Sequence, residues 1–346
     1  MLLGKSKTPR NSLAPVWQAA LPDHVIALDY SADGALLVAA SVSGPIFVYE
    51  VTTGKLKHEL KGHGFGTAGI ECHPNSPTLA SCGQDGHARV WNLETGVQTL
   101  ELAGGAAWVE RLAWNRAGTL LATAAGKTAR VWEWPSGKMV QDYPGHPSTI
   151  ADVAWEPGAG RLSVAVYGGV FHYDPTQAEA DELFEWRGSP LKLAWSPDGK
   201  MLAHGNQDAS VHFWYSEDSR ELNMSGYPSK VRDLSWDFRS RYLATGGGDA
   251  VCIWDCSGAG PEGSKPNMLS MQSGVVSAVM WQRRGTLLAS GDLNGRVCLW
   301  QPANRTPLAG GATFEGTEVS TLIWSRDDKA IAVGSAAGTL GVFRVT

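Results

Sequence analysis

The chain has 346 residues and a formal net charge of −5, and charged residues make up 18% of it. Acidic and basic residues are interspersed, so no extended field of one sign draws in a nucleic-acid backbone or an anionic membrane, and we expect neither as a partner. The 41 glycines, 18 prolines and 15 tryptophans favour many short strands joined by tight turns over long helices.

The N-terminal stretch carries Lys5, Lys7 and Arg10 but lacks the apolar run that a secretory signal needs. We expect residues 1–14 to form a flexible arm in front of one folded domain over residues 15–346. No stretch reaches the ~18 apolar residues of a membrane span. Five cysteines, an odd number scattered along the chain, favour a reducing compartment. Together these features predict a cytoplasmic protein.

Two series of mostly aromatic residues mark an internal repeat. The first series ends an apolar run every 40 to 45 residues, with a cysteine in the one place that lacks an aromatic ring. Its members are Tyr30, Cys72, Trp114, Trp155, Trp195, Trp236, Trp281 and Trp324. The second series follows each of these by 18 or 19 residues and consists of Tyr49, Trp91, Trp132, Tyr173, Trp214, Trp254, Trp300 and Phe343. Two markers in fixed register indicate eight copies of one unit.

Within a repeat the chain alternates strands and turns. In the fifth repeat, a run ending at Trp195 is followed by Ser-Pro-Asp-Gly at residues 196–199 and then by two further runs, the second ending at Trp214. Pro-Asp-Gly is typical of a type I turn between antiparallel strands. A short run between repeats, such as residues 55–60, supplies a fourth strand. Four-stranded units of this length are typical of propeller blades.

The second repeat contains four short motifs, Gly62-His63, Leu79-Ala80-Ser81, Asp85-Gly86 and Val90-Trp91-Asn92. These motifs resemble the signature of the WD-repeat family, and the resemblance extends over residues 15–346. It implies an all-β fold, an eight-bladed WD-repeat β-propeller in which each blade is a four-stranded antiparallel sheet. A seven-bladed ring with one irregular repeat is the alternative. The fold alone does not identify a partner, because it serves many unrelated tasks.

The two ends of the chain predict how the ring closes. The eighth repeat ends at Thr346, directly after its third strand, so its fourth strand is missing. Residues 16–21 precede the first repeat and form a spare strand. We expect this N-terminal strand to complete the last blade, because pairing removes an open sheet edge.

The resemblance implies that His63, Ser81, Asp85 and Trp91 form a hydrogen-bonded network within the second blade. On paper His, Ser and Asp are also the members of a hydrolytic triad. We expect a structural role, because the serine is tied to the tryptophan and a buried, satisfied polar network makes a blade rigid.

A metal site is a second reading of the same region. His63, Cys72, His73, Cys82 and His87 cluster in sequence, and histidine and cysteine are zinc ligands. Their spacing is unfavourable, since Cys72 and His73 would point to opposite faces of one strand. We expect buried core thiols, and neither a metal nor another cofactor.

The number of polar residues near the central channel argues against catalysis. Only His24, Glu110 and Glu318 are expected near its mouth, which is too few for a hydrolase site. We therefore expect no enzyme. A propeller enzyme, or a metal-dependent sensor that uses the channel mouth, remains the alternative.

The resemblance implies that partners bind on the narrower top face, formed by the loops before each first strand and the turns between second and third strands. Trp108 belongs to neither aromatic series, and alternation along the strand places Glu110 on the same side as Trp108. Trp108 is a candidate hot spot, although a tryptophan also fills gaps between blades. Lys230 and Arg232 form a basic counterpart. The candidate partner-binding residues are His24, Gln84, Trp108, Glu110, Gln207, Lys230, Arg232, Leu293 and Glu318. We expect a scaffold that is monomeric when free and binds a protein or peptide there.

Overall fold

The structure is a computed structural model that describes residues 13–158, 160–258, 260–302, 307–314 and 316–346. It contains 32 β-strands in eight four-stranded antiparallel sheets. Within the described ranges, no helix is long and apolar enough to cross a membrane. The eight sheets are the predicted blades, which confirms the eight-bladed propeller and excludes the seven-bladed alternative.

Blades 1 to 4 each take four consecutive strands, starting with the strand next to the axis. Blade 1 consists of β2 (Val25–Tyr30), β3 (Leu36–Ser41), β4 (Ile46–Glu50) and β5 (Leu56–Leu60). Blade 2 consists of β6 (Thr67–Cys72), β7 (Thr78–Gly83), β8 (His87–Asn92) and β9 (Gln98–Ala103). Blade 3 consists of β10 (Val109–Trp114), β11 (Leu120–Ala125), β12 (Thr128–Glu133) and β13 (Met139–Tyr143). Blade 4 consists of β14 (Asp152–Trp155), β15 (Leu162–Val166), β16 (Gly168–Tyr173) and β17 (Glu182–Trp186).

Blades 5 to 7 repeat this order, and blade 8 departs from it. Blade 5 consists of β18 (Pro190–Trp195), β19 (Met201–Asn206), β20 (Val211–Tyr215) and β21 (Glu221–Met224). Blade 6 consists of β22 (Leu234–Trp236), β23 (Tyr242–Thr245), β24 (Val251–Asp255) and β25 (Asn267–Leu269). Blade 7 consists of β26 (Val276–Trp281), β27 (Leu288–Asp292), β28 (Arg296–Trp300) and β29 (Pro307–Thr313). Blade 8 consists of β30 (Val319–Trp324), β31 (Ala330–Ser335), β32 (Thr339–Val345) and β1 (Leu13–Ala20).

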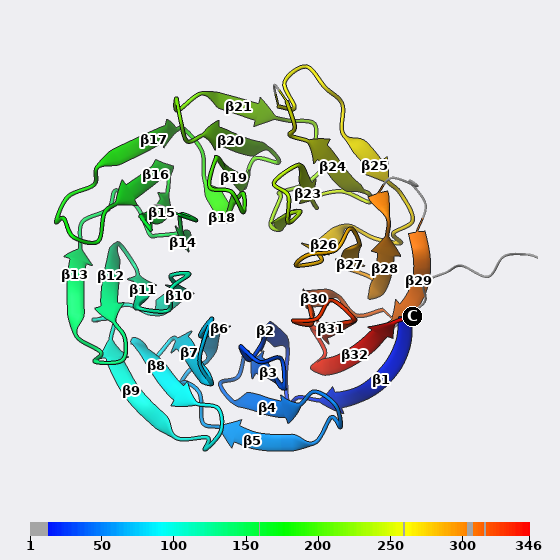
Figure 1. The fold of residues 1–346 in the computed structure, drawn as a ribbon, viewed down its shortest axis with the longest axis horizontal. Coiled ribbons are helices and arrows are strands. Elements are labelled where there is room, and N and C mark those ends of the chain that lie inside the picture. The colour runs from blue at the N-terminus through cyan, green and yellow to red at the C-terminus, as the bar shows by residue number, and fades with distance from the viewer. Residues whose placement is uncertain (1–12, 159, 259, 303–306, 315) are drawn as a thin grey trace, which may run out of the picture.

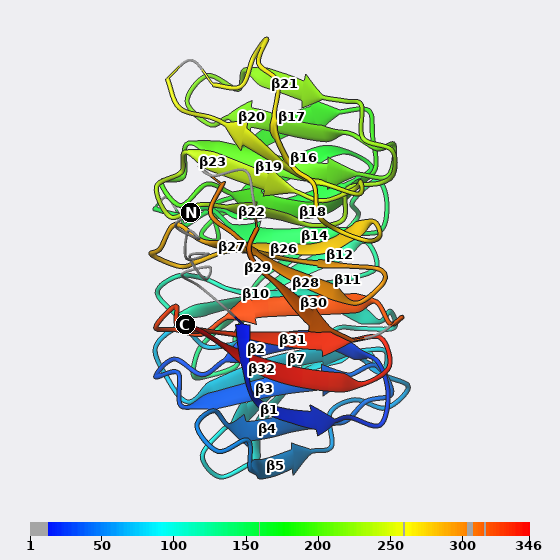
Figure 2. The ribbon, with the colours of Figure 1, turned by 90° about the vertical axis from the view of Figure 1, so that its right-hand side faces the viewer.

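The blades follow one another in chain order around a central channel (Figure 1). Each innermost strand contacts the innermost strands of both neighbouring blades, and β2 of blade 1 contacts β30 of blade 8. Seen from the side, the ring is a disc through which the strands run from one face to the other (Figure 2). The closed ring thus presents two faces, joined by the channel.

The N-terminal strand closes the ring as predicted. β1 pairs antiparallel with β32 over its whole length, from Leu13 opposite Val345 to Ala20 opposite Thr339. The strand begins at Leu13, so the folded domain starts two residues before the expected boundary at residue 15; residues 1–12 lie outside the described part of the chain. Trp17 also donates its indole N–H to the carbonyl of Val51 at 2.8 Å, which ties blade 8 to blade 1.

The predicted turn chemistry is present between first and second strands. Ser196 donates its hydroxyl to Asp198 at 2.7 Å and accepts the backbone N–H of Met201 at 2.9 Å. Gly199 follows with φ of 72°, a left-handed conformation that glycine adopts without strain. Short polar residues therefore satisfy the backbone of the turn and set the register of the two strands.

Tryptophans of the first series fix neighbouring blades to each other. Four of them donate the indole N–H to a backbone carbonyl of the preceding blade, at 2.9 to 3.2 Å. The donors are Trp114, Trp155, Trp236 and Trp324, and the acceptors are Glu71, Ala113, Ala194 and Met280. Because these rings are also buried, one residue per interface supplies both packing and a hydrogen bond.

Acidic side chains in or directly before the innermost strands form a second set of links between blades. Asp29 accepts the backbone N–H of Cys72 at 2.8 Å, and Asp152 accepts that of Leu193 at 2.9 Å. Glu71 and Asp233 accept from Trp114 and Val279 at 3.1 and 2.8 Å. The sequence reading did not identify these four acids. They hold donors that would otherwise be unpaired at the blade boundaries.

A β-bulge recurs in the innermost strands. In six blades the pairing with the second strand shifts by one residue, four residues before the first-series position. The extra residues are Ile26, Ala68, Glu110, Leu191, Ser277 and Ser320. A bulge interrupts the strict alternation of side chains along a strand, so residues on either side of it need not point the same way.

Ring closure makes a direct prediction. A chain that lacks residues 1–20 loses the eight residues of β1, including Trp17, and leaves β32 as an open edge. We expect its free energy of unfolding to fall by more than about 3 kcal/mol, the scale for removing a packed tryptophan, and we expect it to aggregate. A chain that lacks only residues 1–12 is the control and should unfold like the full chain in denaturant titrations. Equal stability of the two truncated chains would contradict this closure.

Candidate partner-binding face and channel

The connections between strands define two faces. We call top face the one formed by the loops before each innermost strand and the turns between second and third strands, and bottom face the opposite one. The C-terminus at the end of β32 lies on the bottom face, which faces the viewer in Figure 1 and lies at the left in Figure 2. All nine predicted partner-binding residues lie in top-face connections or at the adjoining strand ends.

The structure brings four of the nine together at the top mouth of the channel. Glu110, Gln207, Lys230 and Arg232 line one cavity of about 480 Å3. Its wall also includes Arg111 and residues of the channel itself. This mouth is therefore polar and carries charges of both signs.

The other five predicted residues lie outside that cavity. His24, Gln84 and Glu318 are partly buried, whereas the side chains of Leu293 and Trp108 are 43% and 54% exposed. The sequence reading placed Trp108 and Glu110 on the same side of one strand. The bulge at Glu110 separates them: Glu110 turns toward the channel, while Trp108 stands in the loop before β10.

Phe65 is an exposed aromatic residue that the sequence reading missed. Its side chain is 90% exposed, and its backbone has a φ of 65°, a left-handed conformation that is unusual for a bulky residue. Gly64 and Gly66 flank it, and this Gly-Phe-Gly sequence was the signal that could have identified it. The protein thus holds an apolar ring in solvent in a strained conformation, which is typical of functional surfaces.

Phe65 and Trp108 belong to a continuous run of top-face connections across blades 2, 3 and 4. The backbone N–H of Gln84 bonds to Gly66, that of Gly104 to Gly86 and that of Ile150 to Gly126, at 2.8 to 2.9 Å. The backbone N–H of Tyr167 then bonds to the hydroxyl of Ser148 at 2.9 Å. Tyr167 is 59% exposed. We call Phe65, Trp108 and Tyr167 the aromatic arc.

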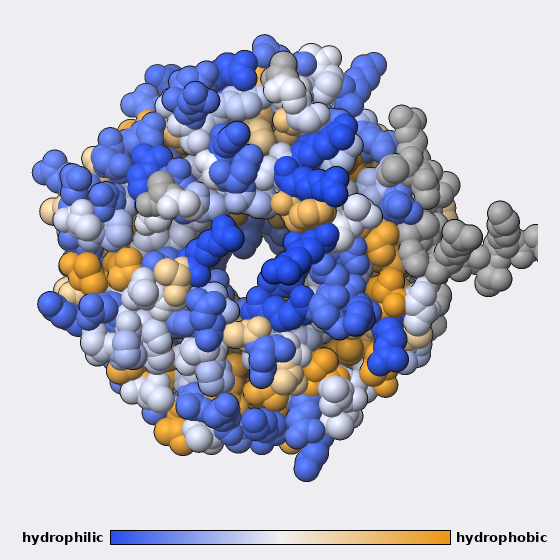
Figure 3. All heavy atoms as spheres, viewed as in Figure 1, coloured by the Kyte–Doolittle hydropathy of each residue, from blue (hydrophilic) through white to orange (hydrophobic). Residues whose placement is uncertain are grey.

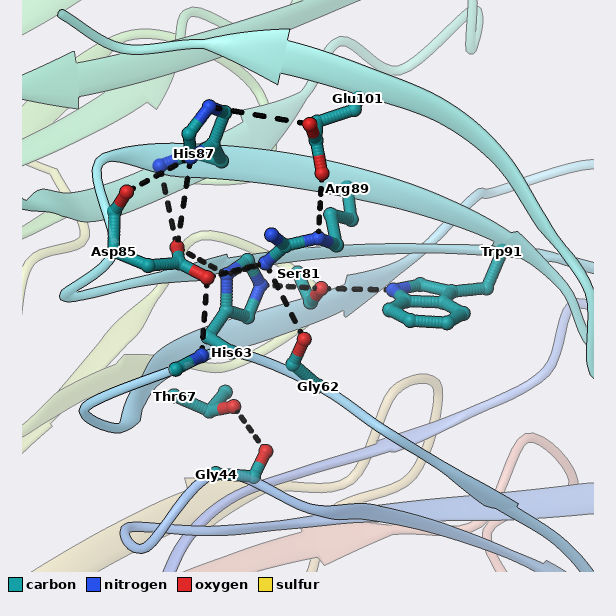
Figure 4. Close-up of polar contacts among 11 residues, drawn as sticks. Gly44, Gly62, His63, Thr67, Ser81, Asp85, His87, Arg89, Trp91 and Glu101 are labelled. Carbon is teal, nitrogen blue, oxygen red and sulfur yellow. Dashed lines mark hydrogen bonds and ion pairs between the residues drawn. The ribbon is translucent and has the colours of Figure 1, made fainter.

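The predicted network of blade 2 forms completely, as Figure 4 shows. Trp91 donates its indole N–H to the Ser81 hydroxyl at 2.9 Å, and that hydroxyl lies 2.8 Å from Nε2 of His63. Nδ1 of His63 lies 2.9 Å from Asp85, and Arg89 contacts the second oxygen of Asp85 at 2.6 Å. Each member has a partner, so the donors run from Trp91 through Ser81 and His63 to Asp85.

The electrostatics of this network favour a structural role. Burial lowers the pKa of His63, which favours the neutral ring, although Asp85 acts in the opposite direction. Although burial opposes it, hydrogen bonds from His63 and Arg89 hold the pKa of Asp85 at about 2. Ser81 is fully buried and accepts from Trp91, so its hydroxyl cannot reach a substrate. The network resembles a triad in composition but ties β7 and β8 to the loop before β6.

Other blades place different side chains where blade 2 has His63, nine residues before the first-series position. In blade 6, the hydroxyl of Tyr227 lies 2.8 Å from the Thr245 hydroxyl and accepts the indole N–H of Trp254 at 2.8 Å. In blade 7, the Gln272 amide donates to Ser290, which also accepts from Trp300. Blades 6 and 7 thus satisfy the third-strand tryptophan, as blade 2 does, but with other polar partners.

Blade 5 replaces this network with a stack of rings. Trp186 occupies the place of the histidine and stacks on His212 with ring centroids 3.8 Å apart. His204 and His212 lie directly opposite each other on β19 and β20, next to Trp214. Both nitrogens of His204 are buried without a hydrogen-bond partner. Burial lowers the pKa of His204 to about 3 and that of His212 to about 4, so both rings are neutral at neutral pH, although Nε2 of His212 lies 3.2 Å from the Glu221 carboxylate.

Opposite charges alternate along one side of the channel. Three residues before the first-series position, blades 3 to 6 carry Arg111, Asp152, Lys192 and Asp233. Asp152 lies 3.7 Å from Arg111 and 3.9 Å from Lys192. In the part of the chain that the structure describes, no group of three or more histidine, cysteine or acidic side chains could hold a metal ion. The cysteine and histidine residues of the zinc hypothesis do not converge.

The blade 2 network predicts the effect of Ser81→Ala. The substitution leaves the indole N–H of Trp91 and Nε2 of His63 buried without partners. We expect the free energy of unfolding to fall by about 2 to 6 kcal/mol, since each of the two unpaired buried groups costs about 1 to 3 kcal/mol. Ser136→Ala, in an exposed turn, is the control. Guanidinium titration measures the difference, and a loss no larger than that of the control would refute the network.

The stacked histidines predict a specific pH dependence. Neutral His212 stabilises the fold above its ordinary pKa, and this contribution is lost as the pH falls toward about 4, because only the unfolded chain takes up the proton. His212→Phe keeps the stack and removes this effect. Below about pH 6.5, we expect the free energy of unfolding of the variant, relative to that of the wild type, to rise by about 1.4 kcal/mol for each unit by which the pH falls. Parallel stability profiles from pH 7.5 to 5 would show that His212 is not held neutral.

Comparisons with known proteins agree with this architecture. The family described as WD domain, G-beta repeat, matches residues 54–92, 96–133, 183–215, 219–255 and 266–301, more than half of the chain. Each match begins near the outermost strand of one blade and ends with the third strand of the next. The matches include the third strands of blades 2, 3, 5, 6 and 7.

Similar proteins come from several organisms. The chain is 22% identical over 284 residues to Autophagy-related protein 16 of Arabidopsis thaliana, an alignment that covers 78% of this chain and 45% of that protein. It is 27% identical over 225 residues to WD repeat-containing protein slp1 of Schizosaccharomyces pombe, covering 61% of this chain and 44% of that protein. The chain thus matches less than half the length of these relatives.

A solved structure shows the same fold. The computationally designed Ika8 protein superposes with a TM-score of 0.82 at 19% sequence identity, over 96% of this chain and 99% of that one. The repeated match across five segments, together with the eight blades, establishes that this chain belongs to the WD-repeat family of β-propellers.

Proposed function

We propose that this protein is a non-catalytic scaffold that binds a protein or peptide partner on its top face, through the aromatic arc and the charged mouth beside it. Membership of the WD-repeat family supports a role in protein interaction in general. The observation that carries the finer proposal is Phe65, an apolar ring 90% exposed in a left-handed backbone conformation. Strain and exposed apolar surface both lower stability, and a bound partner would offset them.

The composition of the surface supports a protein ligand. Aromatic side chains and arginine are the residues that most often dominate binding energy at protein interfaces. The aromatic arc supplies the former, and Lys230 and Arg232 at the top mouth supply cations. A mixed apolar and charged surface of this kind suits a folded partner or a peptide with both apolar and acidic residues.

Backbone hydrogen bonds favour a rigid arrangement of the loops that carry the aromatic arc. The connections that carry Phe65, Trp108 and Tyr167 are joined to their neighbours by the hydrogen bonds described above. Because side chains on fixed loops lose little freedom on binding, a partner meets a surface that is already ordered. The blade 2 network anchors the loop that carries Phe65, since His63 and the backbone N–H of Gly64 both bond to Asp85.

The first test uses the double variant Trp108→Ala with Arg232→Ala. Both side chains are exposed, so the variant should keep its melting temperature. We expect it to lose capture of partners from a lysate of the native host, with affinity lowered at least tenfold, the effect of a loss of about 1.4 kcal/mol. Quantitative mass spectrometry of captured proteins measures this. Undiminished capture would refute the top-face site.

Two further variants sharpen the test. Phe65→Gly removes the ring and suits the left-handed backbone, so it should weaken capture without lowering the melting temperature. Met139→Ala removes a side chain that is 46% exposed, on the outermost strand of blade 3 away from the top face, and should leave capture unchanged. If Met139→Ala weakens capture as much as the double variant Trp108→Ala with Arg232→Ala, the partner contacts the side of the ring.

A further inference from the structure

The bottom mouth of the channel is a cavity of about 870 Å3. Its outer wall carries Arg116, Arg283 and Arg284, and its deeper wall carries Lys192 and apolar residues of the innermost strands. Figure 3 views this face and shows strongly hydrophilic residues gathered along the rim of the central opening. This mouth is on the opposite side of the disc from the aromatic arc, so it is independent of the proposed partner site.

The three arginines reach the cavity from opposite sides of the ring. Arg116 follows β10 in blade 3, whereas Arg283 and Arg284 follow β26 in blade 7. Four blade positions separate these blades, which is half of the eight-membered ring. Guanidinium groups therefore border the mouth on both sides of the axis.

Within the described part of the chain, the guanidinium groups of these arginines are not tied to the fold by hydrogen bonds or ion pairs. Among the described residues, none of the three guanidinium groups has a hydrogen bond or an ion pair. Nε of Arg283 is buried and unpartnered. Arg326, also on this face, contrasts with them, since it lies 3.6 Å from Asp29 and donates to the carbonyl of Ser31.

The acids in the same cavity do not neutralise the rim. Glu156 pairs with Arg161 at 2.6 Å, and Asp152 lies between Arg111 and Lys192. Burial raises the pKa of Glu71 to about 8, so this carboxyl group is largely protonated at neutral pH. The cations of the rim thus remain available to a ligand.

The backbone between the two adjacent arginines is held from the next blade. Asp328 of blade 8 accepts the backbone N–H groups of Arg283 and Arg284, one on each carboxylate oxygen, both at 2.8 Å. Asp328 itself has a φ of 59°. This clamp fixes the directions in which the two arginines leave the backbone, so less freedom is lost when they bind. Burial of Arg283 and the positive charge of Arg326 lower the pKa of Arg283. They outweigh the carboxylates of Asp29 and Asp328, which act to raise it.

We propose that the bottom mouth binds a small polyanion with several phosphoryl groups, held between Arg116 on one side and Arg283 with Arg284 on the other. Guanidinium groups bind phosphoryl oxygens through paired, charge-assisted hydrogen bonds. A ligand with several such groups can engage both sides of the mouth at once, which a single phosphate cannot. The cavity volume lies within the range of sites for small molecules, about 300 to 1,000 Å3.

Calorimetric titration of the full chain with inorganic tripolyphosphate tests the proposal. We expect binding that weakens with added salt, and at least tenfold weaker binding of orthophosphate. Arg283→Ala with Arg284→Ala should weaken tripolyphosphate binding at least tenfold. Lys55→Ala with Lys57→Ala removes two exposed cations from blade 1 and is the charge-matched control, which should bind within twofold of the wild type. Equal weakening in both double variants, or no binding by the wild type, would overturn the proposal.

A second variant covers the risk that loss of the partly buried Arg283 disturbs the fold. Arg116→Ala with Arg284→Ala changes two exposed side chains, and it should weaken tripolyphosphate binding at least tenfold with an unchanged melting temperature. Retained affinity in this variant would overturn the two-sided site. None of these variants alters the top face, so protein capture should be unaffected, and failure here leaves the proposed function standing.

The phosphoryl groups could belong to a soluble molecule or to a lipid headgroup. Co-sedimentation with phosphatidylcholine vesicles that contain phosphatidylinositol bisphosphate separates these sources. Sedimentation of the wild type but not of Arg283→Ala with Arg284→Ala would assign the headgroup. Tripolyphosphate binding without sedimentation would assign a soluble polyanion. Binding to both that is equal in wild type and variant would contradict the site.

Discussion

The pairing of β1 with β32 is the interaction on which the rest of the structure depends. It joins the first described residues of the chain to the last strand, from Leu13 opposite Val345 to Ala20 opposite Thr339. Without it, blade 8 would have three strands and an open edge, and the ring could separate between blades 8 and 1. With it, every blade has two neighbours, and loops distant in sequence meet on two continuous faces (Figure 1).

Within the closed ring, equivalent positions make the stabilising contacts in different blades, although the residues at those positions differ. First-series tryptophans donate to the preceding blade, and channel carboxylates accept from the following one. The position of His63 shows how much variation is tolerated: Tyr227 and Gln272 satisfy the same kind of partner with other atoms, and Trp186 replaces the polar network by stacking. In these blades the tryptophan of the third strand is either hydrogen-bonded to a polar side chain or packed against other rings. The residues that contact it differ from blade to blade.

Much of the fold could be predicted because it depends on periodic residues. Spacing of the two aromatic series determined the number of blades, and the unpaired ends of the chain determined the closure. The blade 2 network was also predictable, because the motifs that contain His63, Ser81, Asp85 and Trp91 resemble the WD-repeat signature, which implies this network. These features depend on local sequence and on the requirement that strands be paired.

The directions and exposure of side chains on the two faces were harder to predict from the sequence, for physical reasons. The bulge at Glu110 breaks the alternation from which the direction of Trp108 was inferred. The exposure of Phe65 follows from a left-handed turn that its flanking glycines only suggest. The arginines of the bottom mouth lie far apart in sequence, and only the ring brings Arg116 opposite Arg283. Side-chain convergence of this kind requires the three-dimensional structure.

Both faces exist only if the N-terminal strand is an integral part of the last blade. Amide hydrogen exchange of the native protein, followed by mass spectrometry, tests this directly on β1. The account predicts that the paired amides of residues 13–20 exchange as slowly as those of the other outermost strands. Exchange of this segment at the rate of an unstructured peptide, while the other blades stay protected, would contradict the closed ring.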